Sequence, residues 1–268
     1  MFTALDLDLN KKVTSFDVER QKWFDHRFIC PFCGDLVSFV SRHYRKETVM
    51  VSPHFRHKPE SKCTYAFEPE THEHMRMKEI MYAWLLVQGF DVDLEHKVDK
   101  VVADVYAVKD DIKVAVEVQA SYVQAERIVY KNKVYFENDI VPLWIVSRNL
   151  VKWKDFEKLL FRGCIWKIYE THNELYVLDT DSKTVYTTKY ASYLGDLIIQ
   201  VNDKKVELVK GSVLEFNVDP EKIGVCPSCL EVLYEDTMIP YYEFNVISGE
   251  TNGFRMCKYC GYKWRENV

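Results

Sequence analysis

Three Cys-x-x-Cys pairs constrain the fold of this 268-residue chain more than any other feature of its sequence. Two intervening residues let both sulfurs of a pair reach one tetrahedral ion from a tight turn. The first residues, MFTALDLDLN, contain no basic stretch followed by an apolar one, so we expect no export signal. In such a chain this spacing favours zinc over disulfides. The pairs are Cys30 and Cys33, Cys226 and Cys229, and Cys257 and Cys260.

The second and third pairs predict a four-cysteine zinc ribbon over residues 221–268. The segment between them, IPYYEFNVISGETNGFRM, alternates as a hairpin with a polar turn does. Gly261 follows Cys260, at a place where such a turn often needs a left-handed residue. Metal binding can supply the folding free energy of so small a unit, so a purely structural role stays open beside a binding role.

The first pair needs two further ligands, and the segment HFRHKPESKC offers three candidates. We prefer His57 and Cys63, because His54 lies at the end of a predicted strand and could instead pack or contact DNA. A structural role for either histidine stays open. The prediction is a strand-rich zinc-binding module over residues 1–68, with Cys30, Cys33, His57 and Cys63 as the zinc ligands.

The net charge of −5 gives no general case for a nucleic-acid partner, but one stretch of the N-terminal module is basic. Arg42, Arg45, Lys46, Arg56, Lys58 and Lys62 stand there against Glu47 and Glu60. Such a patch can contact phosphate, although charge alone fits a solvated loop as well or better. Our candidate nucleic-acid contacts in this stretch are Arg42, Arg45 and Arg56.

Residues 69–150 switch between helical and strand-like patterns. The segment THEHMRMKEIMYAWLLVQG places Met77, Ile80 and Trp84 on one apolar stripe and stops at Gly89. Three candidate strands follow, FDVDLEHKV, VVADVYAV and IKVAVEVQA, separated by short polar turns. SYVQAERIVYKNKVYFEN then predicts a helix, and IVPLWIVS a buried strand. The predicted order is helix, three mostly antiparallel strands, helix and strand.

Acidic side chains interrupt this apolar pattern. In the third strand, Glu117 and Gln119 share the face opposite the aliphatic one. If that strand pairs antiparallel with the one before it, Asp104 approaches Glu117. Two such carboxylates repel unless one is protonated or a cation lies between them. Mg²⁺ and Mn²⁺ prefer oxygen ligands and can activate a water for attack on phosphorus. The simpler alternative, two exposed acids, fits the order of the flanking elements less well.

A third carboxylate, Glu73, lies one turn before Met77 on the inward face of the first helix. Buried there, it needs a partner or a cation.

The rest of the chain carries no motif with an evident chemistry. We expect a mixed α/β extension over residues 151–220, with a helix at FEKLL, a hairpin in ELYVLDTDSKTVYTTK and strands in KKVELVKGSVLEFNV. A domain boundary is expected near Pro220. The longest apolar runs are too short to span a bilayer, so we expect a soluble, cytoplasmic protein with no membrane partner.

The first 150 or so residues resemble the competence protein CoiA family of the PD-(D/E)XK nuclease superfamily. The resemblance rests on CPFCG, HFRH…C, EHMRMK, ADV, EVQAS and LWIV, whose order and spacing fit the family. It implies an α/β, restriction-endonuclease-like core in which Asp104 and Glu117 hold Mg²⁺ or Mn²⁺. It also implies that Glu73 is the helix carboxylate, and that Gln119 replaces the lysine usual in the superfamily.

The same resemblance implies further polar positions at His74 and Lys78 on the helix. Lys131 falls where the family has an arginine, and Val102 where a basic residue is common. We therefore count Lys78 and Lys131 as candidate nucleic-acid contacts. The four-cysteine ribbon lies outside the stretch that carries the resemblance.

The expected function is hydrolysis of phosphodiester bonds in single-stranded or branched DNA. It would serve recombination, processing of incoming DNA or the life cycle of a mobile element. The ribbon could bind a recombination or replication protein. The alternative is a noncatalytic nucleic-acid-binding zinc protein, or an adaptor, with a degenerate nuclease fold.

Overall fold

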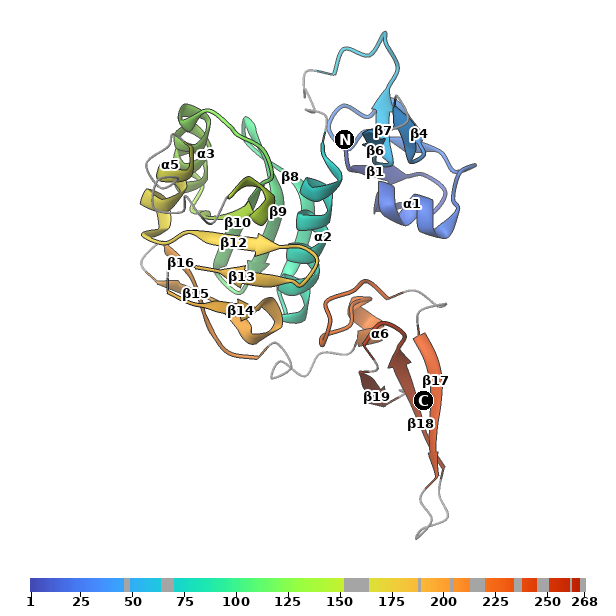
Figure 1. The fold of residues 1–268 in the computed structure, drawn as a ribbon. Coiled ribbons are helices and arrows are strands. Elements are labelled where there is room, and N and C mark those ends of the chain that lie inside the picture. The colour runs from blue at the N-terminus through green and yellow to red at the C-terminus, as the bar shows by residue number, and fades with distance from the viewer. Residues whose placement is uncertain are drawn as a thin grey trace.

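The structure is a computed structural model, and it describes residues 1–45, 49–63, 70–151, 164–187, 189–202, 205–212, 220–233, 238–244, 251–260 and 262–265. Figure 1 shows an α/β body, a strand-rich module at the N-terminus and a small module at the C-terminus. Among the described residues, no helix is long and apolar enough to cross a membrane.

The body is built on a seven-stranded sheet in the order β14-β13-β12-β11-β10-β9-β8. Strands β8, β9 and β10 pair antiparallel, whereas β11 runs parallel to both β10 and β12. The parallel β10–β11 pair needs a crossover connection, and helix α3 supplies it. The strands are β8 (Asp91–Val98), β9 (Val101–Lys109), β10 (Ile112–Gln119), β11 (Val141–Ser147), β12 (Tyr176–Asp179), β13 (Thr184–Tyr186) and β14 (Ala191–Tyr193).

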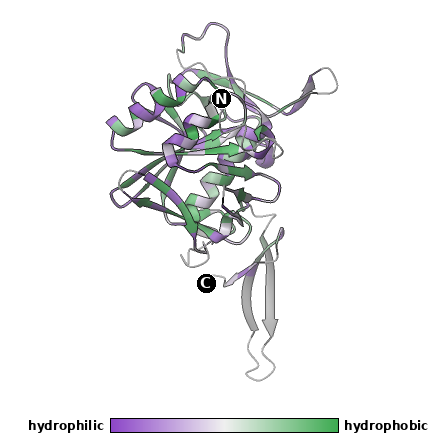
Figure 2. Cartoon of the chain, turned by 60° about the vertical axis from the view of Figure 1, so that its left-hand side comes forward, coloured by the Kyte–Doolittle hydropathy of each residue, from purple (hydrophilic) through white to green (hydrophobic). Residues whose placement is uncertain are grey.

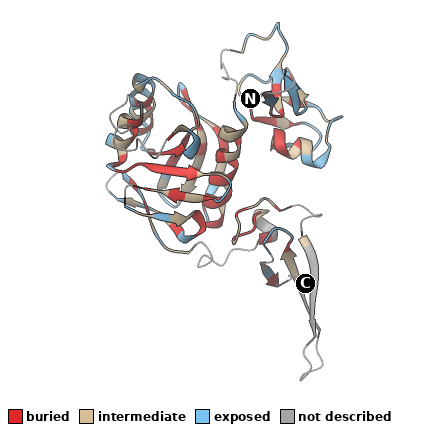
Figure 3. Cartoon of the chain, viewed as in Figure 1, coloured by how far each residue is buried: buried red, intermediate tan, exposed pale blue. Residues whose placement is uncertain are grey.

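Helices cover both faces of this sheet. Helix α2 (His72–Val87) packs its apolar stripe on the face that carries Val114 and Val116. Helices α3 (Ala125–Glu137) and α5 (Cys164–His172) pack on the other side. Apolar residues dominate the strands (Figure 2), and the sheet and α2 are largely buried (Figure 3). The predicted helix, three strands, helix and strand therefore occur in the predicted order.

The N-terminal module is a five-stranded sheet in the order β2-β1-β3-β4-β7. Its small core includes Phe28, Val37 and Phe55. A separate two-stranded sheet, β5–β6, lies between β4 and β7 in the chain. The elements are β1 (Thr3–Asp6), β2 (Lys11–Thr14), α1 (Ser15–Gln21), β3 (Phe28–Ile29), β4 (Leu36–Val40), β5 (His43–Arg45), β6 (Val49–Val51) and β7 (His54–His57).

The C-terminal module holds the predicted hairpin, because β17 pairs antiparallel with β18. Glu231, beside the second Cys-x-x-Cys pair, ties the module to the body: it contacts Arg76 of α2 at 2.6 Å and Lys183 at 2.5 Å. The elements after the body sheet are β15 (Leu197–Asn202), β16 (Lys205–Lys210), α6 (Pro220–Ile223), β17 (Met238–Phe244), β18 (Thr251–Cys257) and β19 (Lys263–Arg265). Two short 3₁₀ turns follow strands of the body sheet: η1 (Arg148–Leu150) comes after β11 and η3 (Leu194–Asp196) after β14.

The boundary predicted near residue 150 does not separate two sheets. Strand β12 pairs in parallel with β11, so the hairpin expected in the extension becomes part of the body. The predicted FEKLL helix lies outside the described residues.

Candidate functional site

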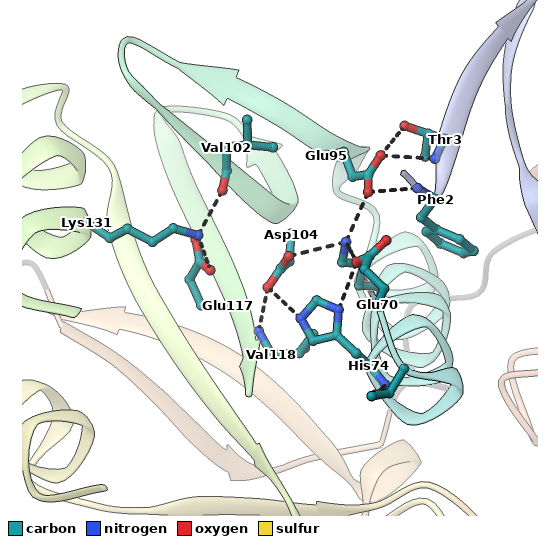
Figure 4. A network of polar contacts seen from close by, with 12 residues as sticks. Phe2, Thr3, Glu70, His74, Glu95, Val102, Asp104, Glu117, Val118 and Lys131 are labelled. Atoms are coloured by element: carbon teal, nitrogen blue, oxygen red, sulfur yellow. Dashed lines mark hydrogen bonds and ion pairs between the residues drawn. The ribbon is translucent and has the colours of Figure 1, made fainter. Parts of the chain in front are cut away.

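A cavity of about 430 Å³ opens where the N-terminal end of α2 meets β9 and β10. Its charged lining comes from Glu70, His74, Lys78, Glu95, Asp104, Glu117, Arg127 and Lys131, most of which Figure 4 labels. Gln119 and the loop that follows β10 line its mouth. The cavity therefore gathers the two strand carboxylates that the sequence singled out.

The backbone pairing of β9 is interrupted at Asp104. The β8–β9 ladder passes from Leu94↔Val105 to His96↔Ala103, and the β9–β10 ladder ends at Val105↔Val116. Within this fully described stretch, neither ladder assigns Asp104 a partner. Its carboxylate instead accepts a hydrogen bond from the backbone N–H of Val118 at 3.0 Å.

The first turns of α2 bring cations to Asp104. His74 and Lys78 are four residues apart and lie along one side of the helix, and Glu70, four residues before His74, precedes the helix and contacts both. Lys78 Nζ lies 3.3 Å from Asp104 Oδ1 and 3.2 Å from Glu95 Oε1, and it also contacts Glu70. His74 lies 2.8 Å from Glu70 and 3.5 Å from Asp104. With only 2% of its surface exposed, Lys78 balances three carboxylates.

Glu95 connects this group to the N-terminal module. It adopts a left-handed backbone conformation with φ 50°. Its carboxylate accepts hydrogen bonds from the backbone N–H groups of Phe2 and Thr3 at 3.1 and 3.0 Å. It also accepts one from the Thr3 hydroxyl at 2.6 Å. Strand β1 therefore reaches the charged group through Glu95 and Lys78 (Figure 4).

The network sets the protonation of its members. Burial alone raises the pKa of Asp104, but Lys78 and His74 outweigh it and hold the pKa well below its usual value. Burial likewise raises the pKa of Glu70, yet Lys78 and His74 bring it down to about 2. For His74 burial lowers the pKa, and Asp104 and Glu70 raise it to about 9. Asp104 and Glu70 are therefore ionised carboxylates that face two cations, Lys78 and His74.

Glu117 lies under α3 in a different setting. Lys131 Nζ contacts one of its oxygens at 2.6 Å and the Val102 carbonyl at 2.9 Å. The Tyr135 hydroxyl donates to the other oxygen. Burial raises the pKa of Glu117 to about 7, with Asp104 adding to the rise and Lys131 opposing it. Glu117 can therefore exchange a proton near neutral pH, which Asp104 cannot.

A metal ion fits the Asp104 side of the cavity. One ligand atom each from Glu70, His74 and Asp104 lie within 4.8 Å of one another, and Glu117 is not a member of this group. Glu70 Oε2 is buried and has no hydrogen-bond partner among the described residues, so it can accept an ion. A nitrogen ligand beside two carboxylates suits Mn²⁺ better than Mg²⁺. Binding there must displace the His74 proton and the Lys78 ammonium.

The structure places other predicted residues differently. Glu73 points inward but away from Asp104: its carboxylate accepts hydrogen bonds from Ser147 at 2.6 Å and Thr180 at 2.8 Å, and it lines a second cavity. Gln119 donates its amide to the Ser121 carbonyl. Glu70 occupies the position that the sequence assigned to Glu73. The sequence feature that could have identified Glu70 is its four-residue spacing to His74 and Lys78, although Glu70 itself precedes the helix.

The predicted nucleic-acid contacts divide into two kinds. Lys78 and Lys131 line the cavity, where their ammonium groups contact carboxylates and their side chains are only 3% and 13% exposed, so a contact with nucleic acid through them stays a prediction. Arg45 and Arg56 are exposed on β5 and β7. Arg42 is also exposed but contacts Glu19 at 2.9 Å.

Both cysteine groups could hold a zinc ion. In the C-terminal group, Sγ atoms of Cys226 and Cys260, and of Cys229 and Cys257, lie 3.7 Å apart. A tetrahedral ion with Zn–S bonds of about 2.3 Å sets neighbouring sulfurs about 3.8 Å apart. The N-terminal group consists of Cys30, Cys33, His57 and Cys63, all with ligand atoms within 4.8 Å.

His57, and not His54, completes the N-terminal group. His57 Nε2 lies 3.4 Å from Cys33 Sγ. His54 instead lies 3.0 Å from the Ser52 carbonyl through Nδ1. The seven cysteines of the two groups form no disulfides, so their thiols are available to a metal.

The fold and the site define an α/β protein with a carboxylate-lined cavity in its body and two cysteine-rich modules. A sequence profile of the family "Competence protein CoiA, nuclease-like domain" matches residues 70–212, more than half of the chain, and the chain therefore belongs to that family. The Competence protein CoiA of Bacillus subtilis (strain 168) is 28% identical over 136 residues, which cover 50% of this chain and 35% of that protein. No solved structure matches the chain.

Proposed function

We propose that the protein is a divalent-metal-dependent deoxyribonuclease with a restriction-endonuclease-like core. The observation that carries the proposal is the meeting of Asp104 and Glu117 in one cavity, in a chain of the CoiA nuclease-like family. The two acids lie on neighbouring strands, but their surroundings give them different protonation states. A reaction that must both bind a cation and move a proton requires such a pair.

The residues divide the work as follows. Asp104, Glu70 and His74 would hold Mn²⁺ or Mg²⁺, which when bound polarises the scissile phosphate and lowers the pKa of a water. Glu117 would take the proton of the attacking water, because its pKa of about 7 suits a general base. Lys131, held 2.6 Å from Glu117, would supply the positive charge that Gln119 lacks.

The two zinc modules would hold the DNA, with Arg45 and Arg56 as phosphate contacts on the N-terminal one. The relative from Bacillus subtilis is named for competence, which supports a role in processing incoming DNA. The same cleavage of DNA would also serve recombination or the life cycle of a mobile element. The ribbon would also be the contact for a recombination or replication protein.

The test is cleavage of labelled single-stranded, duplex and branched DNA by the zinc-loaded protein with Mn²⁺ or Mg²⁺. Asp104→Asn should lower the single-turnover rate about 100-fold or more, because metal assistance is worth several kcal/mol. Asp111→Asn is the matched control, since this exposed acid lies in the turn between β9 and β10, the strands that carry Asp104 and Glu117. Cleavage that survives both Asp104→Asn and Glu117→Gln would refute the proposal.

One observation favours the noncatalytic alternative. Lys78 and His74 already place positive charge against Asp104 and Glu70, and Lys78 also contacts Glu95, so these acids have cations beside them without a metal. A protein that only binds nucleic acid would show steep salt dependence and yield no product with any divalent ion.

A further inference from the structure

The first Cys-x-x-Cys turn of the C-terminal module is a small closed loop that lies against the body. We call residues 224–233 the knuckle. Its own backbone closes it, because the Cys226 N–H donates to the Glu231 carbonyl at 2.9 Å and Val225 pairs with Val232 across the loop. A loop closed in this way presents its remaining backbone groups in fixed positions.

The edge of the body sheet holds two carbonyls of the knuckle. The Tyr193 hydroxyl, at the end of β14, donates to the Ser228 carbonyl at 2.8 Å. Lys183, just before β13, donates from Nζ to the Cys229 carbonyl at 2.5 Å. Cys229 is a member of the C-terminal cysteine group, and Ser228 precedes it. The body therefore contacts the same turn that would bind the zinc ion.

Glu231 extends this contact to helix α2. Its carboxylate lies 2.5 Å from Lys183 and 2.6 Å from Arg76 of α2. Arg76 is two residues from both cavity cations of the helix, His74 and Lys78. Two residues turn an α-helix by about 200°, so Arg76 leaves α2 on the side away from those cations. The knuckle thus holds α2 from behind the cavity.

Two aliphatic side chains of the knuckle complete the core of the body. Val225 and Leu230 are each only 1% exposed, and both belong to the buried cluster that contains Trp84 of α2. Leu230 directly follows Cys229 and has a left-handed backbone with φ 57°. A residue other than glycine keeps that conformation only where its surroundings impose it. The fold of the cysteine turn and the packing of the body therefore depend on each other.

We propose that the knuckle is a zinc-dependent clasp on α2. An ion held by Cys226, Cys229, Cys257 and Cys260 fixes the turn that the body contacts, and loss of the ion loosens α2. In a small cysteine module the free energy of metal binding is also folding free energy. Metal affinity and the order of α2 are then coupled, and coupling of this kind is reciprocal. The inference goes beyond the proposed nuclease and requires neither DNA nor cleavage.

The first test measures the metal affinity of the C-terminal group in the full chain. Co²⁺ stands in for Zn²⁺, because the visible absorption of a four-thiolate site differs from that of the N-terminal group, with three thiolates and an imidazole. Glu231→Gln should weaken Co²⁺ binding to the four-thiolate site about tenfold, since it removes the carboxylate shared by Arg76 and Lys183. Glu170→Gln is the matched control, because Glu170 pairs with Lys167 at 2.6 Å within α5.

The second test follows hydrogen–deuterium exchange of α2 by mass spectrometry. Cys260→Ser removes an exposed ligand of the C-terminal group and leaves every residue of the knuckle in place. The first half of α2 should then exchange about tenfold faster, because its clasp is weakened. Helix α3, which packs on the other face of the sheet, should keep its exchange rate and serves as the internal control.

Equal Co²⁺ affinities of Glu231→Gln and Glu170→Gln would overturn the clasp. Exchange of α2 that Cys260→Ser leaves unchanged, or that rises no more than exchange of α3, would do the same. Glu231→Gln keeps all four cysteines, so its titration decides the question if Cys260→Ser does not fold. The clasp and the nuclease fail separately, since neither readout involves DNA and cleavage assays report nothing on metal affinity of the knuckle.

Discussion

The two strand carboxylates of the cavity are close in the sheet but differ in their surroundings. Asp104 sits among Lys78 and His74, which keep its pKa well below the usual value. Glu117 is buried between Lys131 and Tyr135, and its pKa rises to about 7. We call these surroundings the Asp104 half and the Glu117 half of the cavity.

The difference lies in the ratio of acids to cations. In the Asp104 half, Lys78 contacts Asp104, Glu70 and Glu95, so loss of the Lys78 charge removes a cation from three carboxylates at once. In the Glu117 half, one lysine serves one acid, which can also neutralise itself by taking a proton. The Lys131 side chain is also somewhat more exposed than that of Lys78, at 13% against 3%.

The largest effect should come from breaking the Asp104 half. Lys78→Met should destabilise the protein by about 3–5 kcal/mol, since it leaves buried carboxylates without their cation. Lys131→Met should cost about 1–2 kcal/mol, because Glu117 can protonate and keeps Tyr135 as a donor. Urea unfolding followed by circular dichroism measures both. Equal losses would show that the two halves do not differ in charge balance.

The second prediction uses pH on the metal-free protein. Because the folded pKa of Glu117 is raised from 4.5 to about 7, its contribution to stability is full below pH 4.5 and is lost as pH rises to about 7, by about 3 kcal/mol in all. The lowered pKa of Asp104 has the opposite sign: its contribution is present above pH 3.8 and is lost below it.

The measurement compares unfolding free energies of wild type, Glu117→Gln and Asp104→Asn between pH 4.5 and 8. The gap between wild type and Glu117→Gln should change across this range, and the gap for Asp104→Asn should change in its own way, because Asp104 raises the pKa values of both Glu117 and His74. If all three profiles run parallel, Glu117 does not titrate near neutral pH.

The third prediction asks whether Glu70 or Glu73 supports metal binding in the Asp104 half. Glu70→Gln should weaken Mn²⁺ binding about tenfold to a hundredfold, by the loss of a carboxylate ligand and its support of His74. Glu73→Gln is a close control, because Glu73 lies three residues away and faces Ser147 and Thr180. Titration followed by the paramagnetic resonance of free Mn²⁺ measures both. A larger loss in Glu73→Gln would restore the assignment made from the sequence.

The sequence predicts the elements of the body well, because their periods of 3.6 and 2 residues are local properties. Alternation alone placed Glu117 on the face opposite Val116, where it lies. Glu70 escaped this reasoning since it precedes the N-cap residue Thr71, so its four-residue spacing to His74 and Lys78 begins outside the helical pattern. The contact of Lys131 with Glu117 depends on how α3 crosses the sheet, which no local pattern specifies.

Two other features needed the tertiary structure. The role of Glu95 depends on a left-handed turn in β8 and on strand β1, more than 90 residues away along the chain. The pairing of β11 with β12 is also nonlocal, so the sequence suggested a domain boundary where the sheet continues. Spacing did identify the cysteines that could hold a metal ion, because ligand geometry is local within each Cys-x-x-Cys pair.

The smallest effect should come from one hydroxyl in the Glu117 half. Tyr135→Phe removes a donor to Glu117 but leaves Lys131 in place, so we expect a loss of about 1 kcal/mol in stability. The hydrogen bond favours ionised Glu117, so its removal should move the Glu117 titration to higher pH. Tyr193→Phe is the control, as that hydroxyl donates to the Ser228 carbonyl at 2.8 Å, away from the cavity. A titration that stays in place in Tyr135→Phe would mean that Lys131 alone sets the state of Glu117, and the Glu117 half would then be as dependent on one cation as the Asp104 half.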